Sequence, residues 1–311
     1  MAGIETNIVD GQSLVVMAMY KFVHLPDYID LKAPLLAYCQ KHSLYGTILL
    51  AAEGINGTTA GSRSGIDKLL KYFAQDERFS GMECKESSAE AMPFHRMKVK
   101  LKKEIVSMGI ATINPAAVTG TKIDPLDWNS IISDPEVLLI DARNQYEIDI
   151  GIFKNAISPE TETFREFPDY VNNNLDPKKQ KKVAMYCTGG IRCEKASAYL
   201  LQQGFEQVYQ LNGGILKYLE EVEPENSLWQ GECFVFDGRV AVNDELKPGI
   251  YAQCYACRRP VSPEQMASEK YEEGVSCPHC YGTLSAEKRV AVTERQRQVR
   301  LAKQRNAINN I

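Results

Sequence analysis

Residues 181–204, KKVAMYCTGGIRCEKASAYLLQQG, restrict the possible folds of this chain more than any other segment. The apolar run that ends at Cys187 predicts a buried strand, and the run from Arg192 onward predicts a helix that stops at Gly204. Similar apolar runs occur at 136–143 and 205–211. Buried strands that alternate with helices are typical of a mainly parallel sheet with helices on both faces. The sequence therefore predicts an α/β domain over residues 126–222.

The preceding part of the chain, residues 1–110, predicts a different, α+β arrangement. Its alternating patterns read as strand, helix, strand, strand, helix, strand, which is the order of a ferredoxin-like fold. These elements are expected at 13–23, at 27–44, twice within 45–61, at 62–76 and at 94–109. Residues 111–125 are rich in Thr, Pro and Gly, so we predict a linker there.

The last part, residues 223–311, is predicted to hold a hairpin, a metal site and a basic tail. The hairpin is expected at 233–243, with its turn at Asp237–Gly238. Two C-x2-C pairs separated by 19 residues follow: Cys254, Cys257, Cys277 and Cys280. This spacing is typical of a zinc ribbon, in which four thiolates close a tetrahedral structural Zn²⁺ site. His279 lies between two of these ligands and competes with them, but four cysteines suffice.

Composition and charge limit the setting and the partners of the chain. Nine cysteines are present, an odd number, and the N-terminus has neither the basic nor the apolar region of a signal peptide. We therefore expect reduced thiols, metal ligands or catalytic cysteines in a cytoplasmic protein. No apolar run approaches the roughly 18 residues of a membrane span, so no membrane partner is expected. The net charge of −4 disfavours a surface that is basic throughout, but it leaves room for local basic patches.

Cys187 is the candidate nucleophile. It lies at the carboxyl end of a predicted parallel strand, where ligands bind in such sheets, and it faces the start of the next helix. The glycines of the loop allow the backbone to curl into an anion-binding nest, which lowers a thiol pKa below about 8.5. The predicted nest comprises Thr188, Gly189, Gly190 and Ile191. The alternative is a buried cysteine before an ordinary turn.

Three motifs resemble those of rhodanese domains: DARNQYEIDIGIFKNAIS from Asp141, YCTGGIRCE around Cys187, and LNGGI. The sequence departs from the family pattern at Ile152, where many members have His, and at Asn155, where many have Gly. The four residues between the cysteine and the arginine are one fewer than in related phosphatases, which disfavours phosphatase chemistry. The predicted catalytic residues are Cys187, Arg192, Cys193, Asp141 and Arg143. Cys193 either resolves an oxidised Cys187 or only packs.

Taken together, five ordered motifs resemble a narrower family, the rhodanese-domain tRNA uridine hydroxylases. They are LAAEGINGTTAG, FHRMKVKLKKEIVSMG, YCTGGIRCEKASAYL, CFVFDGRVAV and the double CxxC. The resemblance implies oxygen-dependent formation of 5-hydroxyuridine at the wobble position of tRNA, with molecular oxygen as co-substrate. It implies no particular organic cofactor. The rival readings are a sulfurtransferase that carries a persulfide on Cys187, and an RNA-binding protein without catalytic activity.

Two basic segments are candidate RNA contacts. Arg96, Lys98, Lys100 and Lys102 alternate with apolar residues, so on a strand they form a basic stripe on one face. The alternative is an ordinary solvated face. The tail 287–305 carries seven basic and two acidic residues and is either a basic or a frayed terminal helix. Glu53 and Asn56 lie in a Gly-rich turn, where hairpin formation is favoured over a direct function.

Overall fold

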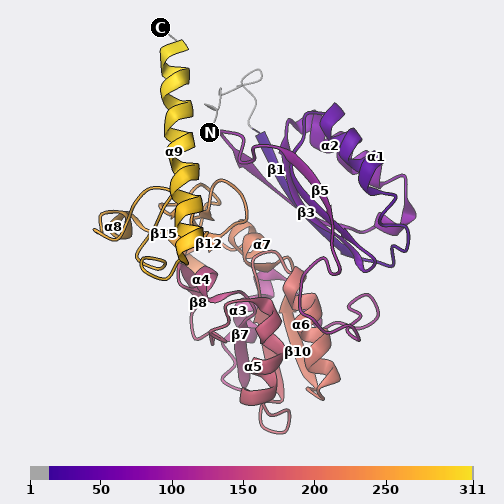
Figure 1. Ribbon diagram of the computed structural model, residues 1–311. Coiled ribbons are helices and arrows are strands. Elements are labelled where there is room, and N and C mark those ends of the chain that lie inside the picture. Colours follow the sequence, from indigo (N-terminus) through magenta and orange to yellow (C-terminus); the bar gives the residue numbers. More distant parts are fainter. Residues whose placement is uncertain (1–13, 310–311) are drawn as a thin grey trace. The chain divides into compact units, whose positions relative to one another are not determined.

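The computed structural model describes the backbone of residues 14–309 (Figure 1). Within this range the chain divides into two compact units. The larger unit holds residues 14–238 and 242–247, and the smaller unit holds 239–241 and 248–309.

The N-terminal part of the larger unit is a five-stranded sheet with two main helices. In chain order its elements are β1 (Leu14–Phe22), α1 (Lys32–Lys41), β2 (Tyr45–Ala51), β3 (Gly54–Gly61), α2 (Arg63–Phe73), the 3-10 turn η1 (Glu77–Phe79), β4 (Glu83–Ala89) and β5 (Met97–Leu101). The strand order is β4-β1-β3-β2-β5. The first four strands pair antiparallel, and β5 pairs parallel with β2. This topology confirms the predicted ferredoxin-like fold.

The identity of the fourth strand differs from the prediction. The lysine-rich segment was expected to complete the six-element pattern, but β4 completes it and β5 is an additional edge strand. The sequence of β4, ECKESSA, is mostly polar, so it carries no apolar signal. A strand at a sheet edge needs little apolar surface, so no apolar pattern in the sequence indicates β4.

The two faces of this sheet differ. Met17, Met19 and Val99 lie on one face and share a buried core with Leu35 of α1 and Leu69 of α2. Side chains alternate along a strand, so Ala18, Tyr20, Thr47, Thr58 and Lys98 lie on the other face. The start of α2 is fixed by the Ser62 hydroxyl, which accepts a hydrogen bond from Gly65 N at 3.2 Å.

The rest of the larger unit contains a four-stranded parallel sheet, order β6-β10-β9-β7. The strands are β6 (Thr121–Ile123), β7 (Val137–Asp141), β9 (Lys182–Tyr186) and β10 (Gln207–Leu211). The helices and short turns are α3 (Pro125–Ile132), α4 (Gln145–Ile148), η2 (Phe164–Glu166), α5 (Phe167–Asn174), α6 (Ile191–Gln202), α7 (Gly214–Glu221) and η3 (Pro224–Asn226). Strands β8 (Gly151–Phe153) and β11 (Trp229–Gly231) pair antiparallel beside it.

Separate buried cores lie against the two faces of the parallel sheet, as predicted for this fold. One contains Val171 of α5 and Leu200 of α6, and the other contains Trp128 of α3 and Tyr218 of α7. β6 lies inside the segment 111–125 that was predicted to be a linker, and Ile113 of that segment is buried in the first core. Three residues are too few to show a strand pattern, so the sequence did not reveal β6.

The remaining elements are short apart from one helix. They are β12 (Cys233–Phe234), β13 (Ala241–Val242), β14 (Ala252–Gln253), β15 (Pro260–Val261), α8 (Pro263–Met266) and α9 (Ala286–Asn309). In the smaller unit, β14 and β15 pair antiparallel. None of the helices within residues 14–309 combines the length and the apolar character needed to cross a membrane.

Candidate active site and metal centre

Cys187 directly follows β9, and α6 begins four residues later. Gly190, the residue before α6, has φ +97°, a left-handed conformation that favours glycine. This turn directs Gly190 N toward Cys187 Sγ at 3.2 Å. The predicted loop of Thr188, Gly189, Gly190 and Ile191 therefore brings a backbone donor to the sulfur.

The Cys187 thiol is buried, with no exposed surface. Burial alone would raise its pKa. A hydrogen bond from the Cys193 thiol, the charge of Arg192 and the backbone N–H groups of Cys193 and Arg192 outweigh burial and lower the pKa to about 6. Cys187 is thus a thiolate at neutral pH, which is the nucleophilic form of cysteine.

Cys193 lies on the first turn of α6 and is also fully buried. Burial, and then its hydrogen bond to Cys187, raise the pKa of Cys193 well above its usual value. The two cysteines therefore divide their roles, since one is a thiolate and the other remains a protonated donor. Cys193 contacts the sulfur directly, and whether it also resolves an oxidised Cys187 stays a prediction.

Arg192 forms a bidentate ion pair with Glu147 of α4, with Nη1–Oε2 at 2.6 Å and Nη2–Oε1 at 2.7 Å. Thr188 Oγ1 lies 3.3 Å from both Glu147 Oε1 and Arg192 Nη2. Arg192 opposes the burial of Glu147 and keeps the pKa of that carboxyl below its usual range. Glu147 was recognised in the sequence as a motif residue but was not assigned to the site.

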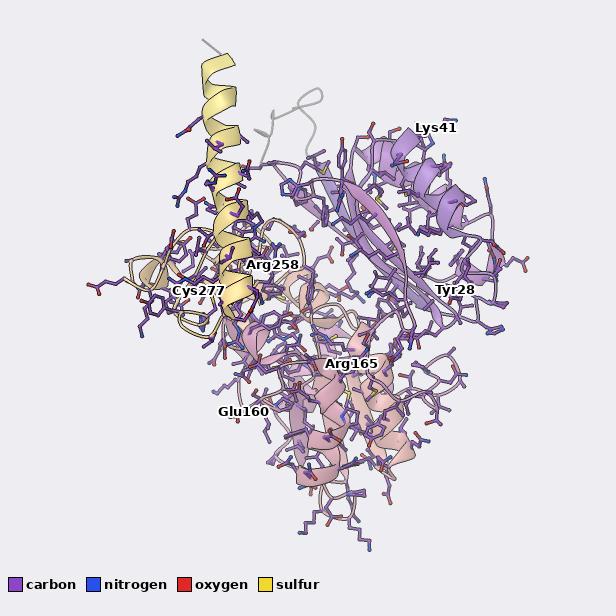
Figure 2. All side chains as sticks on the ribbon, in the orientation of Figure 1. Tyr28, Lys41, Glu160, Arg165, Arg258 and Cys277 are labelled. Atoms are coloured by element: carbon purple, nitrogen blue, oxygen red, sulfur yellow. The ribbon has the colours of Figure 1, made fainter. Side chains whose placement is uncertain are left out.

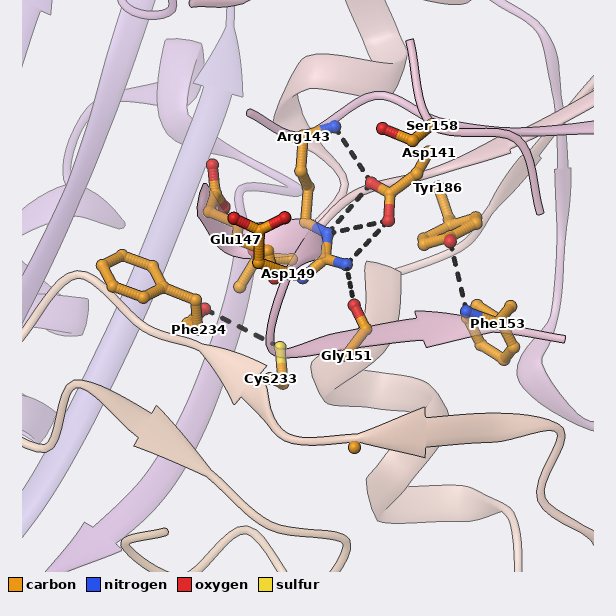
Figure 3. A network of polar contacts seen from close by, with 12 residues as sticks. Asp141, Arg143, Glu147, Asp149, Gly151, Phe153, Ser158, Tyr186, Cys233 and Phe234 are labelled. Atoms are coloured by element: carbon orange, nitrogen blue, oxygen red, sulfur yellow. Dashed lines mark hydrogen bonds and ion pairs between the residues drawn. The ribbon is translucent and has the colours of Figure 1, made fainter. Parts of the chain in front are cut away.

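Asp141 and Arg143 form a second buried ion pair (Figure 3), with Nη2–Oδ2 at 2.7 Å and no exposure of either side chain. Arg143 also donates to Gly151 O at 2.6 Å and to Glu147 O at 3.3 Å. These bonds connect the end of β7 to β8 and α4. Arg143 thus binds backbone carbonyls of the rhodanese motif that begins at Asp141. A catalytic role for the Asp141–Arg143 pair stays a prediction.

The closing motif LNGGI packs directly on the loop. Ile215 N donates to Cys187 O at 3.0 Å and Leu216 N donates to Thr188 O at 3.1 Å. Gly214 has φ +69°, and a Cβ there would lie 2.7 Å from Thr188 O and 2.8 Å from Gly189 N. A glycine is needed at this position because the loop backbone occupies the space of a side chain.

Residues of the N-terminal sheet contact the same loop, and the sequence did not reveal them. Tyr20 donates a hydrogen bond to Glu194 Oε1 of α6 at 3.2 Å, and its hydroxyl lies 3.0 Å from where a Cβ at Gly190 would be. Lys122 of β6 binds both Glu83 and Glu194, each at 3.0 Å.

A second connection to α6 is a buried lysine. Lys195 pairs with Glu53 at 2.8 Å and with Glu104 at 2.7 Å. Glu53 also accepts from Ile105 N at 2.6 Å, and Asn56 donates to Ile105 O at 2.9 Å. Glu53, in the turn before β3, and Asn56, in β3 itself, therefore fix the segment after β5.

The four basic stripe residues lie on and beside β5. Arg96, Lys100 and Lys102 are exposed, Lys98 is half-buried, and Val99 between them is buried. The predicted alternation of a basic and an apolar face is present. The described basic side chains of α9 are exposed as well.

The candidate metal centre is in the smaller unit, where Figure 2 labels Cys277. Sγ atoms of Cys254, Cys257, Cys277 and Cys280 all lie within 4.8 Å of one another. Neighbouring pairs are separated by 3.7, 3.8 and 3.9 Å. Zn–S bonds of about 2.3 Å place the sulfurs of a tetrahedral site about 3.8 Å apart, so the four thiols fit a metal ion such as Zn²⁺. His279 Nε2 lies 3.0 Å from Gln265 Nε2 and outside this cluster.

Two family profiles match the chain. The profile of the UPF0176 acylphosphatase like domain matches residues 14–105, and that of the rhodanese-like domain matches residues 125–221. The chain has the architecture of the UPF0176 family. The resemblance to tRNA uridine hydroxylases, inferred from the motifs, is thereby confirmed at the level of family. The rhodanese-like domain indicates an enzyme of the rhodanese family.

Solved structures show similarity to parts of this chain. The BH2092 protein from Bacillus halodurans is 25% identical over 36% of this chain and 77% of its own, with a TM-score of 0.28. The rhodanese-like domain of the Alr3790 protein from Anabaena sp. is 19% identical over 36% of this chain and 80% of its own, with a TM-score of 0.29. A rhodanese-related protein from Thermoplasma volcanium is 24% identical over 33% of this chain and 95% of its own, with a TM-score of 0.27.

Proposed function

We propose that this protein hydroxylates a wobble uridine of tRNA at C5, with Cys187 as the nucleophile. The observation that carries the proposal is the setting of Cys187, where Gly190 N lies 3.2 Å from Sγ and where Cys193, Arg192 and backbone N–H groups lower the thiol pKa to about 6 despite burial. A thiolate at neutral pH suits covalent catalysis on a base. Its occurrence in a rhodanese-like domain joined to a UPF0176 N-terminal domain supports tRNA as the substrate.

In this mechanism, the Cys187 thiolate adds to C6 of the uracil ring, and the electron pair moves to C5 and the C4 carbonyl. C5 then attacks molecular oxygen and forms a C5–O bond. Two molecules of a small thiol, which we assign as the reductant, supply two electrons and two protons, cleave the O–O bond, release water and are oxidised to a disulfide. Loss of the C5 proton and of the thiolate restores the ring as 5-hydroxyuridine and frees Cys187.

Because the Cys187 thiol is buried, the side chains over the loop must move before a base reaches it. A wobble base lies in an unpaired loop, where it can leave the stack at a cost of only a few kcal/mol. The stripe of Arg96, Lys98, Lys100 and Lys102 is proposed to bind phosphates. We further propose that the ion held by the four cysteines is a structural Zn²⁺ and that the protein acts in the cytoplasm.

The test is mass spectrometry of tRNA nucleosides from a deletion strain complemented with wild-type protein or with Cys187→Ser. We expect 5-hydroxyuridine to disappear on deletion, to return with the wild type and to stay absent with the variant. Normal levels in the deletion strain would exclude the proposal. If Cys187→Ser restored 5-hydroxyuridine, the modification would need the protein but not its thiol. The protein would then be an RNA-binding protein without thiol catalysis.

A second candidate is a sulfurtransferase, because the same loop suits a persulfide on Cys187, where Gly190 N lies 3.2 Å from Sγ. Cys187 would take the outer sulfur of thiosulfate, release sulfite and pass the sulfur to an acceptor thiol. Thiosulfate labelled at that sulfur separates the two functions. Label on an acceptor thiol or on RNA supports the transferase, and a hydroxylase leaves both unlabelled.

A further inference from the structure

The face of the N-terminal sheet opposite α1 and α2 leads from the basic stripe to the Cys187 loop, and Met92 and Phe94 cover its Val16 end. The register places one row of side chains across all five strands, through the pairs Lys98–Thr47, Thr47–Thr58, Thr58–Ala18 and Ala18–Lys85. Neighbouring strands lie about 4.8 Å apart, so the two lysines end a row about 19 Å long. The three residues between them are small and half-buried.

The Lys85 end of this row meets the candidate active site. Lys85 Nζ lies within contact distance of the position that a side chain at Gly213 would occupy, and Gly213 directly precedes α7. In the next row, Tyr20 pairs with Glu83 and reaches Gly190 of the Cys187 loop. The N-terminal sheet therefore supplies side chains beside the thiol.

The charges of Glu83 and Glu220 favour the protonated form of Lys85, and the charge of Lys217 opposes it. Lys85 is half-buried, and no carboxylate of the described residues forms an ion pair with it. Burial is the largest of these effects and lowers the pKa of Lys85. A half-buried cation beside a catalytic loop is stabilised by an anion from a ligand, and a phosphate is such a group.

The other end of this face, at β5 and β2, also carries lysines. Lys98 and Lys100 lie on this face of β5, opposite Thr47 and Leu49. Tyr45 of β2 also lies on this face and is 37% exposed. Lysines bind a nucleic-acid backbone, and an exposed ring offers a stacking surface for an unpaired base.

We propose that this face binds the backbone of an unpaired tRNA loop along the row from Lys98 to Lys85 and presents one of its bases to Cys187. The inference rests on the proposed tRNA substrate. Lys85 binds the phosphate nearest the reacting base, and Tyr20 is a positioning residue that fixes the sheet against the loop. The N-terminal domain then forms one wall of the site and is not only a distant anchor for RNA.

The test is binding of a fluorescent RNA hairpin, with an anticodon-type loop that contains an unmodified uridine, to full-length protein over a salt series. All proteins carry Cys187→Ser to prevent turnover. Lys85→Gln is expected to weaken binding and to reduce the magnitude of the salt slope by about 0.7, the value for one phosphate contact of a single strand. Lys85→Arg keeps the charge and should retain the slope. The matched control is Lys68→Gln, an exposed lysine of α2 on the other side of the sheet, which should leave the slope unchanged.

Two outcomes would overturn the inference. One is an unchanged slope for Lys85→Gln alongside a reduced slope for Lys98→Gln, which would confine RNA to the outer edge. The other is photo-crosslinking of a 4-thiouridine at the wobble position to residues 286–309 alone. Expected crosslinks lie in β1, β4 or residues 187–190. Neither readout depends on hydroxylation, so a strain that retains 5-hydroxyuridine after deletion would contradict the proposed function separately.

Discussion

Glu147 Oε1 and Oε2 bind Arg192 Nη2 and Nη1 at 2.7 and 2.6 Å, and both side chains are almost completely buried beside the Cys187 loop. The guanidinium of Arg192 is thus occupied by a carboxylate and acts on Cys187 through its charge. Glu147 partly offsets that charge at the sulfur.

The first prediction concerns Glu147→Gln. Removing one partner leaves a buried, uncompensated Arg192, which costs about 3–5 kcal/mol of unfolding free energy. In the fraction that folds, the thiol pKa of Cys187 should fall further because an anion near the thiolate has gone. Urea unfolding and thiolate absorbance measure both effects. The control is Glu136→Gln, which removes an exposed partner of Lys182 and should change stability far less. Equal effects of the two variants would contradict this account.

The second prediction is a pH dependence of stability that requires Cys187. Its folded pKa of about 6 is below the reference value of 9.0, so folding favours the thiolate. The contribution is therefore fully present above about pH 9 and is lost as the pH falls through about 6. The stability difference between wild type and Cys187→Ala should grow from pH 6 to pH 9 in urea titrations. If the stabilities of wild type and Cys187→Ala changed with pH in parallel, Cys187 would be protonated in the folded protein over this range.

The third prediction compares two loop glycines. A Cβ at Gly214 would collide with the backbone of Thr188 and Gly189, and φ there is +69°, whereas a Cβ at Gly189 meets nothing within 4 Å. Gly214→Ala should therefore destabilise the protein by more than about 1 kcal/mol and displace the loop. Gly189→Ala should retain stability and the low thiol pKa of Cys187. Calorimetry and thiolate absorbance test both, and a harmless Gly214→Ala would contradict the packing described for the loop.

The sequence predicted the parts of the fold that have local signals. Strands β7, β9 and β10 are short apolar runs next to turn or helix signals, so the parallel sheet was found from pattern alone. The two C-x2-C pairs are also local signals, because the two cysteines of each pair lie within four residues of sequence. The loop glycines predicted a turn after Cys187, and Gly190 adopts the left-handed conformation there.

Features set by contacts between distant residues were not predictable in this way. β4 is an almost wholly polar edge strand, and its place in the sheet depends on pairing with β1. Tyr20 and Glu194 are 174 positions apart, so nothing in the local sequence links them. The burial of Cys187 likewise depends on packing around the loop. Asn155 shows a partial local signal, since its φ of +64° is tolerated by Asn where rhodanese domains often have Gly.

The fourth prediction is that purified protein contains one Zn²⁺ per chain. The sulfur separations of 3.7–3.9 Å fit four thiolates around one ion. Cys254→Ser should lose most of the metal, and chelation should unfold the smaller unit before the larger, because binding energy at such sites contributes to folding. Cys84→Ser, which changes an exposed cysteine outside the cluster, is the control and should keep its zinc. Elemental analysis that finds equal zinc in both variants would exclude the site.

The fifth prediction concerns Lys195, which is 1% exposed and joins α6 to Glu53 and Glu104. Lys195→Met would leave two carboxylates facing each other without a cation, at a cost approaching the 3–5 kcal/mol of a broken buried pair. The carboxylates of Glu53 and Glu104 are partly exposed, so water solvates them and the loss of stability is smaller.

The loss from Lys195→Met should appear as faster hydrogen exchange in residues 103–108, because Lys195 also donates to Val106 O at 3.0 Å. Adding Glu53→Gln and Glu104→Gln to Lys195→Met should recover part of the stability, since the repulsion is then removed. The control is Lys182→Met, which removes a lysine that pairs with Asp134 and Glu136 at the far end of the parallel sheet. Hydrogen exchange in residues 103–108 of this variant should stay as in the wild type. If Lys195→Met also left that exchange unchanged, the segment after β5 would be held by Asn56 and Glu53 through Ile105 alone.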